Sequence, residues 1–114
     1  MIFVVDDDPR IRQLTAEALR LSGHEVRSFS GGREALAAIE DAPDLKLLVT
    51  DVLMPGMDGP ALVRAALSKR PDIKVHYISG DVGATTAERL LPWPLLAKPF
   101  TAMALRYAVA VAMG

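Results

Sequence analysis

Short apolar runs recur along the chain, and each is followed by polar or turn-forming residues. Short runs of this kind are typical of strands that are buried on both faces of a sheet. Between these segments, apolar residues recur at the spacing of a helix. We therefore expect strands at residues 2–5, 25–29, 45–50, 73–78 and 95–97.

The intervening segments carry the signals that begin and end helices. Asp8 and Pro9 predict the start of the first helix, because an aspartate can cap free N–H groups and proline fits the first helical position. Ser22 and Gly23 predict its end. The second helix is expected after Gly31 and Gly32, and it carries Ala35, Leu36 and Ile39. The third is expected to begin at an Asp58 cap, to carry Leu62, Ala66 and Leu67, and to end before Pro71. The last two helices are expected at 84–91 and from about Ala102.

Five strands that alternate with five helices predict βαβ units, hence an α/β fold with a parallel sheet and helices on both faces. All strands of such a sheet run in one direction, so their carboxyl ends lie along one edge. A strand order of 2-1-3-4-5 would make the first and third strands neighbours. The chain of 114 residues fits one domain, at residues 1–114.

Composition excludes several kinds of function. Thirteen basic residues nearly balance fourteen acidic ones, so the chain lacks the positive field that direct nucleic-acid binding needs. Without cysteine, neither a disulfide framework nor a thiolate metal site is possible. The longest apolar stretch, 107–113, is too short to cross a bilayer, and no signal peptide is recognisable. We expect a cytoplasmic domain that does not insert into membranes.

The polar residues of interest lie at the predicted strand ends. Asp6 and Asp7 follow the first strand, Asp51 the third, Ser79 the fourth and Lys98 the fifth. Open α/β sheets bind ligands at this carboxyl edge, at the point where the strand order reverses. The order 2-1-3-4-5 would therefore bring the three carboxylates together.

These residue types suit the transfer of a phosphoryl group. Clustered carboxylates repel one another unless a cation neutralises them, and Mg²⁺ (or Mn²⁺) prefers such oxygen ligands. Lys98 adds a fixed positive charge, and Ser79 offers a hydroxyl donor. A carboxylate nucleophile beside a metal, an ammonium and a hydroxyl matches the charge of a phosphoryl group in transfer.

Four segments of the chain resemble the signature segments of response-regulator receiver domains, the chemotaxis-regulator-like modules of two-component signalling. They are VVDDDP at 4–9, VTDVLMPGMDG at 49–59, ISG at 78–80 and KPF at 98–100. The segments occur in the order and at the separations of that family, and the match runs over about 2–113. The resemblance implies a flavodoxin-like, doubly wound five-stranded sheet of order 2-1-3-4-5.

The resemblance also implies the role of each acid. Asp51 is the expected phospho-acceptor, which takes the group from a phosphohistidine on a histidine kinase or a histidine phosphotransfer protein. Asp7, Asp51 and the backbone carbonyl of Leu53 are expected to bind Mg²⁺ directly, and Asp6 through a metal-bound water. The domain would not be an enzyme in the ordinary sense, although it assists its own phosphorylation and dephosphorylation.

Further residues of the expected site follow from the same resemblance. Ser79 is expected to hydrogen-bond the phosphoryl group and move with it, Lys98 to pair with it, and Gly80 to leave access open. The Lys98–Pro99 bond is expected to be cis, as receivers commonly have it. Leu95 departs from the family, which usually has an aromatic switch residue there.

Other functions compete with this interpretation. Asp6, Asp7 and Asp8 would repel a flavin phosphate, which disfavours a flavodoxin-like redox module. A haloacid-type phosphatase needs a second acid at the position that Leu53 occupies, and a leucine cannot transfer a proton, which disfavours this class. A pseudo-receiver that only docks partners stays open because of Leu95. The domain could stand alone, or it could be fused to, or dock on, an output or kinase domain.

Four polar residues have simpler explanations. Asp8 and Asp58 are expected to be helix caps rather than metal ligands. His24 is expected in an exposed turn, and His76 within the fourth strand is not expected to take part in phosphoryl transfer. Trp93 lies two residues before Leu95 and could substitute for the missing ring.

Overall fold

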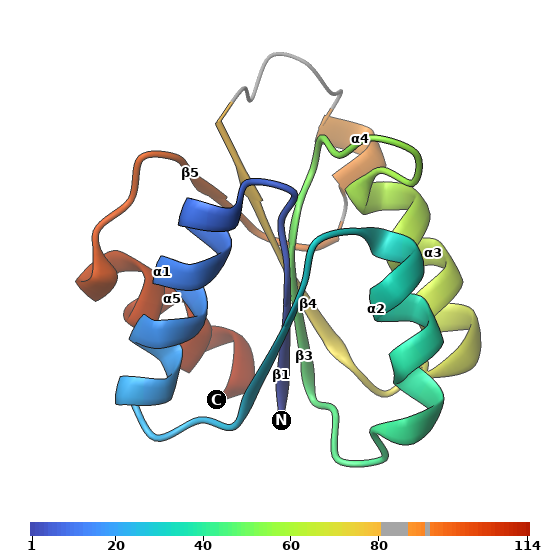
Figure 1. The fold of residues 1–114 in the computed structure, drawn as a ribbon, viewed down its shortest axis with the longest axis horizontal. Coiled ribbons are helices and arrows are strands. Elements are labelled where there is room, and N and C mark those ends of the chain that lie inside the picture. Colours follow the sequence, from blue (N-terminus) through green and yellow to red (C-terminus); the bar gives the residue numbers. More distant parts are fainter. Residues whose placement is uncertain (81–86, 91) are drawn as a thin grey trace.

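In a computed structural model that describes residues 1–80, 87–90 and 92–114, the chain folds around a parallel sheet of five strands (Figure 1). The strand order is β2-β1-β3-β4-β5, which confirms the predicted fold. Each strand begins and ends within two residues of its predicted bounds. The strands are β1 (Ile2–Val5), β2 (Val26–Phe29), β3 (Leu47–Asp51), β4 (Lys74–Ser79) and β5 (Leu95–Ala97).

Helices connect the strands as predicted, with one difference at the end of the second helix. Ile39 lies in a short 3₁₀ turn, η1 (Ile39–Asp41), that continues from α2. The expected helix at 84–91 is described only as α4 (Ala87–Leu90), and the rest of that range lies outside the described residues. The other helices are α1 (Pro9–Leu21), α2 (Gly32–Ala38), α3 (Gly59–Lys69) and α5 (Ala102–Met113).

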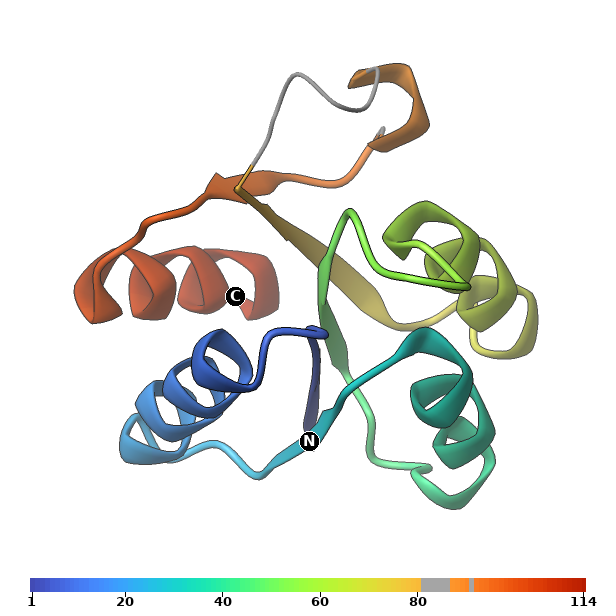
Figure 2. The ribbon, with the colours of Figure 1, turned by 45° about the horizontal axis from the view of Figure 1, so that its top comes forward.

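The sheet is covered on both faces, with α1 and α5 on one side and α2 and α3 on the other (Figure 2). Alternate residues of β1 therefore enter different cores. Ile2 and Val4 pack with α1 and α5, and Phe3 and Val5 pack with α2 and α3. All four side chains are fully buried, which explains the continuous apolar run in the sequence.

Side-chain caps fix the starts of α1 and α3, two of the helices that leave the carboxyl edge. Asp8 accepts hydrogen bonds from the amides of Arg10 and Ile11, and Asp58 accepts one from the amide of Ala61. The predictions of Asp8 and Asp58 as caps are thus confirmed. Each cap joins a helix to the loop that carries an acid of the expected site.

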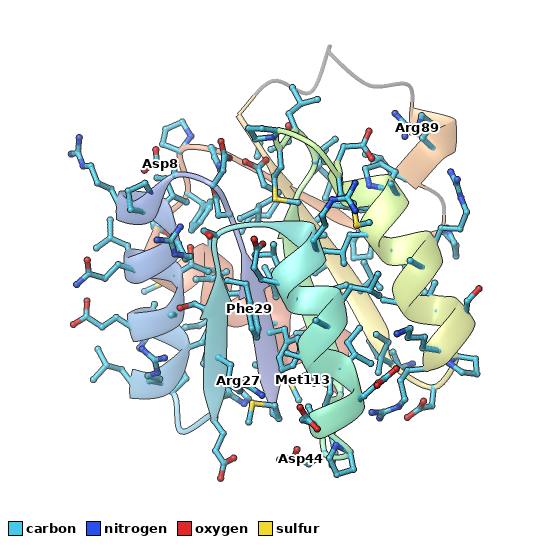
Figure 3. The ribbon with its side chains drawn as sticks, turned by 45° about the vertical axis from the view of Figure 1, so that its right-hand side comes forward. Asp8, Arg27, Phe29, Asp44, Arg89 and Met113 are labelled. Atoms are coloured by element: carbon cyan, nitrogen blue, oxygen red, sulfur yellow. The ribbon has the colours of Figure 1, made fainter. Side chains whose placement is uncertain are left out.

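The carboxyl ends of the strands form the upper edge of the molecule in Figures 1 and 3. Figure 3 shows Asp8 and Arg89 at this end, whereas Asp44 and Met113 lie at the opposite end. Val5 pairs with Thr50, and Ser79 pairs with Ala97, so the residues after these strands meet at one edge. Within the described residues, no helix has the length and apolar character that a membrane span requires.

Candidate functional site

Three carboxylates converge at the carboxyl edge. Asp6 follows β1, Asp7 is its neighbour, and Asp51 is the last residue of β3. One oxygen of each lies within 4.8 Å of the others. Asp6 is 0% exposed and Asp51 is 7% exposed, whereas Asp7 is open to solvent. The structure therefore brings together the three acids that the sequence placed at strand ends.

Asp6 is held through all of its polar groups. Its amide donates to the carbonyl of Phe29 at 3.2 Å, and its Oδ1 accepts the amide of Asp8 at 2.9 Å. Its carbonyl accepts Nη1 of Arg12 at 2.9 Å. Its Oδ2 lies 2.9 Å from Nζ of Lys98, in an ion pair. Asp6 is thus the fixed member of the acidic cluster.

Lys98 bridges the first and third strands. Its Nζ pairs with Oδ2 of Asp6 and donates to Oδ2 of Asp51 at 3.1 Å. The backbone amide of Lys98 donates to the carbonyl of Ser79 at 2.8 Å, which ties the end of β5 to β4. The Lys98–Pro99 bond is cis, as expected. The Lys98 side chain is 17% exposed, so its charge acts in a poorly solvated setting.

Lys98 pairs with only two of the three acids, which leaves the site short of positive charge. Burial raises the pKa of Asp51, the hydrogen bond from Lys98 opposes this, and the nearby charge of Asp6 raises the pKa further. For Lys98, burial lowers the pKa, but pairing with Asp6 and Asp51 outweighs it and holds the pKa above its usual value. Lys98 therefore stays charged, and the carboxylates are incompletely neutralised.

The donor set fits a hard divalent cation. The Asp7 carboxylate has no hydrogen-bond or ion-pair partner in the described part of the chain, and it faces solvent. Leu53, whose backbone carbonyl is an expected Mg²⁺ ligand, lies in the loop after β3 and is 44% exposed. Carboxylate and carbonyl oxygens with room for water are the ligands that Mg²⁺ prefers.

Ser79 and Gly80 lie beside the lysine. Ser79 is the last residue of β4, and it is buried. Gly80 is exposed, and a Cβ built there would lie 3.7 Å from Cδ of Lys98, an ordinary contact. The site therefore has room for a residue as small as alanine at position 80.

The loop after Asp51 closes back on the strand that carries it. Gly59 starts α3, and a Cβ at this position would lie 2.3 Å from the Asp51 carbonyl oxygen and 3.0 Å from Cα of Val52. The amide of Gly59 donates to the carbonyl of Val52 at 2.8 Å. Gly59 lies in the segment 49–59 that resembles a receiver signature, and this close approach of backbones explains the glycine there.

Leu95, where the family that the sequence resembles usually has an aromatic residue, is half-buried on the face covered by α3. It pairs in register with Tyr77 of β4, and both pack in the same cluster as Leu90 and Trp93. Burial raises the pKa of Tyr77 to about 12, and the charge of Asp58 adds to this. An aromatic ring is thus present beside position 95, on the neighbouring strand.

Three interactions at this edge were missed in the sequence. Arg12 binds the carbonyl of Asp6, and Arg89 of α4 pairs with Oδ2 of the Asp58 cap at 3.1 Å. Tyr77 lies beside Leu95. No local signal marks such contacts, because each depends on where a long side chain reaches in three dimensions.

The two histidines lie as predicted in the chain, with one difference in exposure. His24 follows the end of α1 and is half-buried rather than exposed. His76 is buried within β4, and its Nδ1 donates to the carbonyl of Tyr77 at 2.9 Å. The interactions described for His76 serve the sheet and not the acidic cluster.

Comparison with known families gives one match over most of the chain. The model of the response regulator receiver domain matches residues 2–110. The sequence is 35% identical over 104 residues to the C4-dicarboxylate transport transcriptional regulatory protein DctD of Rhizobium meliloti, covering 89% of this chain and 22% of DctD. It is 34% identical over 104 residues to the sensor kinase CckA of Brucella abortus, covering 88% of this chain and 11% of CckA.

A solved structure is similar over the whole fold. The receiver domain of NtrX from Brucella abortus has a TM-score of 0.86 and 32% identity, with 99% of this chain and 98% of that chain covered. The chain therefore matches a single domain throughout, whereas it spans less than a quarter of DctD and of CckA.

Proposed function

Because the chain belongs to the response regulator receiver domain family, we propose that it is a phospho-accepting module of a two-component phosphorelay, with Asp51 as the acceptor. Receiver domains are signalling modules rather than enzymes. The observation that supports this role best is the placement of Asp51 beside Lys98, with Asp6 and Asp7 in the same cluster.

Each residue has a distinct part in the proposed reaction. Asp7, Asp51 and the carbonyl of Leu53 would hold Mg²⁺, which supplies positive charge at the phosphoryl oxygens. Asp6 would act through water, since its carboxylate is already engaged by Lys98 and by the amide of Asp8. The clustered acids with a single unpartnered carboxylate are the features that fit such a cation.

The acceptor step would be a simple displacement at phosphorus. A carboxylate oxygen of Asp51 attacks the phosphorus of a phosphohistidine, an O–P bond forms, and the P–N bond to the imidazole breaks. The electron pair of that bond leaves with the imidazole. Lys98 is positioned to pair with the transferred group, and Ser79 would donate a hydrogen bond to it. Gly80 would leave the approach open, and its exposed position supports this.

The proposed phosphodonor is a histidine kinase or a histidine phosphotransfer protein in the cytoplasm. The relatives differ in what surrounds the domain, since one is named a transcriptional regulator and another a sensor kinase. We propose that residues 1–114 form one receiver unit that either stands alone or is joined to, or docks on, an output or kinase domain. Phosphorylation would alter that docking.

The test is phosphorylation by a small donor. The purified domain is incubated with acetyl phosphate and Mg²⁺, and the modified residue is mapped by mass spectrometry after reductive trapping. We expect an adduct on Asp51 that depends on the metal and is absent from Asp51→Asn. Equal labelling of Asp51→Asn would refute the assignment.

Leu95 favours one alternative, a pseudo-receiver that binds partners without productive switching. In that case Asp51 would not be labelled, or labelling would leave partner binding unchanged. Binding of a cognate kinase or output domain before and after phosphorylation separates the two functions. An affinity that is the same in both states would favour the pseudo-receiver.

A further inference from the structure

Arg12 lies four residues into α1, and it reaches back to the acidic loop. Its Nη1 donates to the carbonyl oxygen of Asp6 at 2.9 Å, and its side chain is half-buried. The first turn of α1 contains no acid, and a cation near a helix N-terminus is disfavoured by the helix dipole. The position of Arg12 is therefore not explained by the helix itself.

The carbonyl that Arg12 binds belongs to the peptide between Asp6 and Asp7. A peptide unit is planar, so a bond that fixes its oxygen also fixes the direction in which the next residue leaves. The amide of Asp8 donates to Oδ1 of Asp6, which fixes the far side of the same turn. Asp7 is thus held between two anchored groups.

Asp7 depends on these anchors because its own side chain has none. Its carboxylate is exposed and has no partner among the residues that the structure describes. Its distance from Asp51 is consequently set by the backbone. A carboxylate ligand that is oriented in advance binds a metal more tightly than one that must be ordered on binding.

We propose that Arg12 is a positioning residue, which orients Asp7 for the metal by holding the Asp6–Asp7 peptide. The inference rests on the proposed function, since it concerns the same site. A purely electrostatic role makes the opposite prediction. If Arg12 acted only as a nearby positive charge, its removal would make the cluster more negative and would tighten metal binding.

The experiment measures Mg²⁺ affinity of the unphosphorylated domain by isothermal titration calorimetry. Arg12→Met removes the hydrogen bond and the charge, and we expect binding roughly tenfold weaker. Arg10→Met is the matched control, because Arg10 is an exposed neighbour on α1 and loses the same charge. Its affinity should equal that of the wild type or be slightly tighter.

Arg12→Lys isolates geometry at constant net charge. An ammonium offers one compact donor in place of the planar fork, so we expect an affinity roughly two- to threefold weaker than wild type. If Arg12→Met does not fold, the Mg²⁺ affinity of Arg12→Lys is the test. Wild-type or tighter Mg²⁺ binding in either Arg12 variant would overturn the inference.

A second measurement needs no metal. In amide spectra of the metal-free domain, Arg12→Met should shift the Asp7 and Asp8 resonances and speed their hydrogen exchange, whereas Arg10→Met should leave Asp7 unchanged. Unchanged Asp7 and Asp8 resonances in Arg12→Met would also overturn the inference. If the wild type bound no Mg²⁺ at all, both the proposed function and the positioning role of Arg12 would fail. If the wild type bound Mg²⁺ and the Arg12 variants bound it equally well, only the positioning role would fail.

Discussion

The ammonium of Lys98 lies 3.1 Å from Oδ2 of Asp51 and joins the last strand of the sheet to its middle. The two residues are 17% and 10% exposed in their side chains, so this is a largely buried ion pair. Removing one partner of such a pair leaves the other charge buried and unpaired.

Lys98→Met should destabilise the metal-free domain by about 3 kcal/mol, because Asp6 and Asp51 both lose their cation. Urea unfolding at neutral pH measures this change. The matched control is Lys69→Met, which removes a lysine that pairs with Glu40 where both side chains are exposed. That change should cost less than about 1 kcal/mol. Equal losses in the two variants would contradict the buried-pair argument.

Asp51→Asn should stabilise the metal-free domain by an amount on the order of 1 kcal/mol at neutral pH, because Lys98 keeps its ion pair with Asp6 and no charge is left unpaired. The folded-state pKa of Asp51 is raised, mainly by burial, so the native state holds this proton more tightly than the unfolded chain. The wild type should therefore lose stability as pH rises from the unfolded pKa through the raised one. Asp51→Asn should lack this loss in chemical unfolding measured between pH 4 and 7.

Saturating Mg²⁺ should make the wild type more stable than Asp51→Asn. Binding to the native state stabilises it, and the wild type gains more than Asp51→Asn because the amide is a weaker metal ligand. Thermal melting with and without the metal measures the difference. An equal rise in melting temperature for both proteins would show that Asp51 is not a ligand.

Gly59→Ala should destabilise the domain by roughly 1–3 kcal/mol, because its methyl group would meet the Asp51 carbonyl at 2.3 Å. The Asp51 carbonyl oxygen belongs to the backbone, so it cannot turn aside. Gly80→Ala is the control at the same edge, since its methyl group has ordinary contact distances. It should stay within about 0.5 kcal/mol of wild type. A mild effect of Gly59→Ala would mean that the loop can open.

His76 should make the domain sensitive to mild acid. Burial lowers its folded-state pKa, and the hydrogen bond to Tyr77 only partly opposes this. The unfolded chain therefore binds the proton more readily, and stability should fall as pH drops below about 6.5 towards the lowered value. His76→Leu should flatten this part of the stability curve. A curve of unchanged slope in the variant would assign the acid sensitivity to other groups.

Phosphorylation should be read out mainly near Ser79 rather than at position 95. Leu95 lacks a ring and a polar tip, and the adjacent Tyr77 already fills the shared cluster. With beryllofluoride as a phosphoryl mimic, amide shifts should be larger at Ser79 and Gly80 than at Leu95 and in α5. Leu95→Tyr should increase the response at position 95 if the missing ring is the cause. Equal wild-type shifts at the two places would contradict this view.

The strands and the acidic cluster could be predicted because their signals are local. An apolar run such as Ile2–Val5 marks a buried strand, and parallel topology then brings the residues after β1 and β3 to one edge. The caps at Asp8 and Asp58 were equally local.

Longer-range contacts could not be predicted in the same way. Arg10 and Arg12 are both basic residues at the start of α1, and the sequence does not say which one turns towards Asp6. That depends on the rotation of the helix against the sheet. The pairing of Arg89 with Asp58 depends likewise on how α4 packs beside the loop. Such side chains are placed by the assembled fold and not by their neighbours in sequence.

The spread of the site along the chain has a consequence for biosynthesis. Asp6 lies near the start of the sequence, whereas Lys98 follows β5, a short strand at the edge of the sheet. Translation at about 5–20 residues per second needs roughly 5 to 20 seconds to pass from one residue to the other. Until Lys98 is made, the acids that have already been synthesised lack the ammonium that pairs with Asp6 and Asp51 in the folded domain. We therefore expect a ribosome-bound chain that ends before β5 to be unable to take a phosphoryl group, so that only completed domains enter the relay.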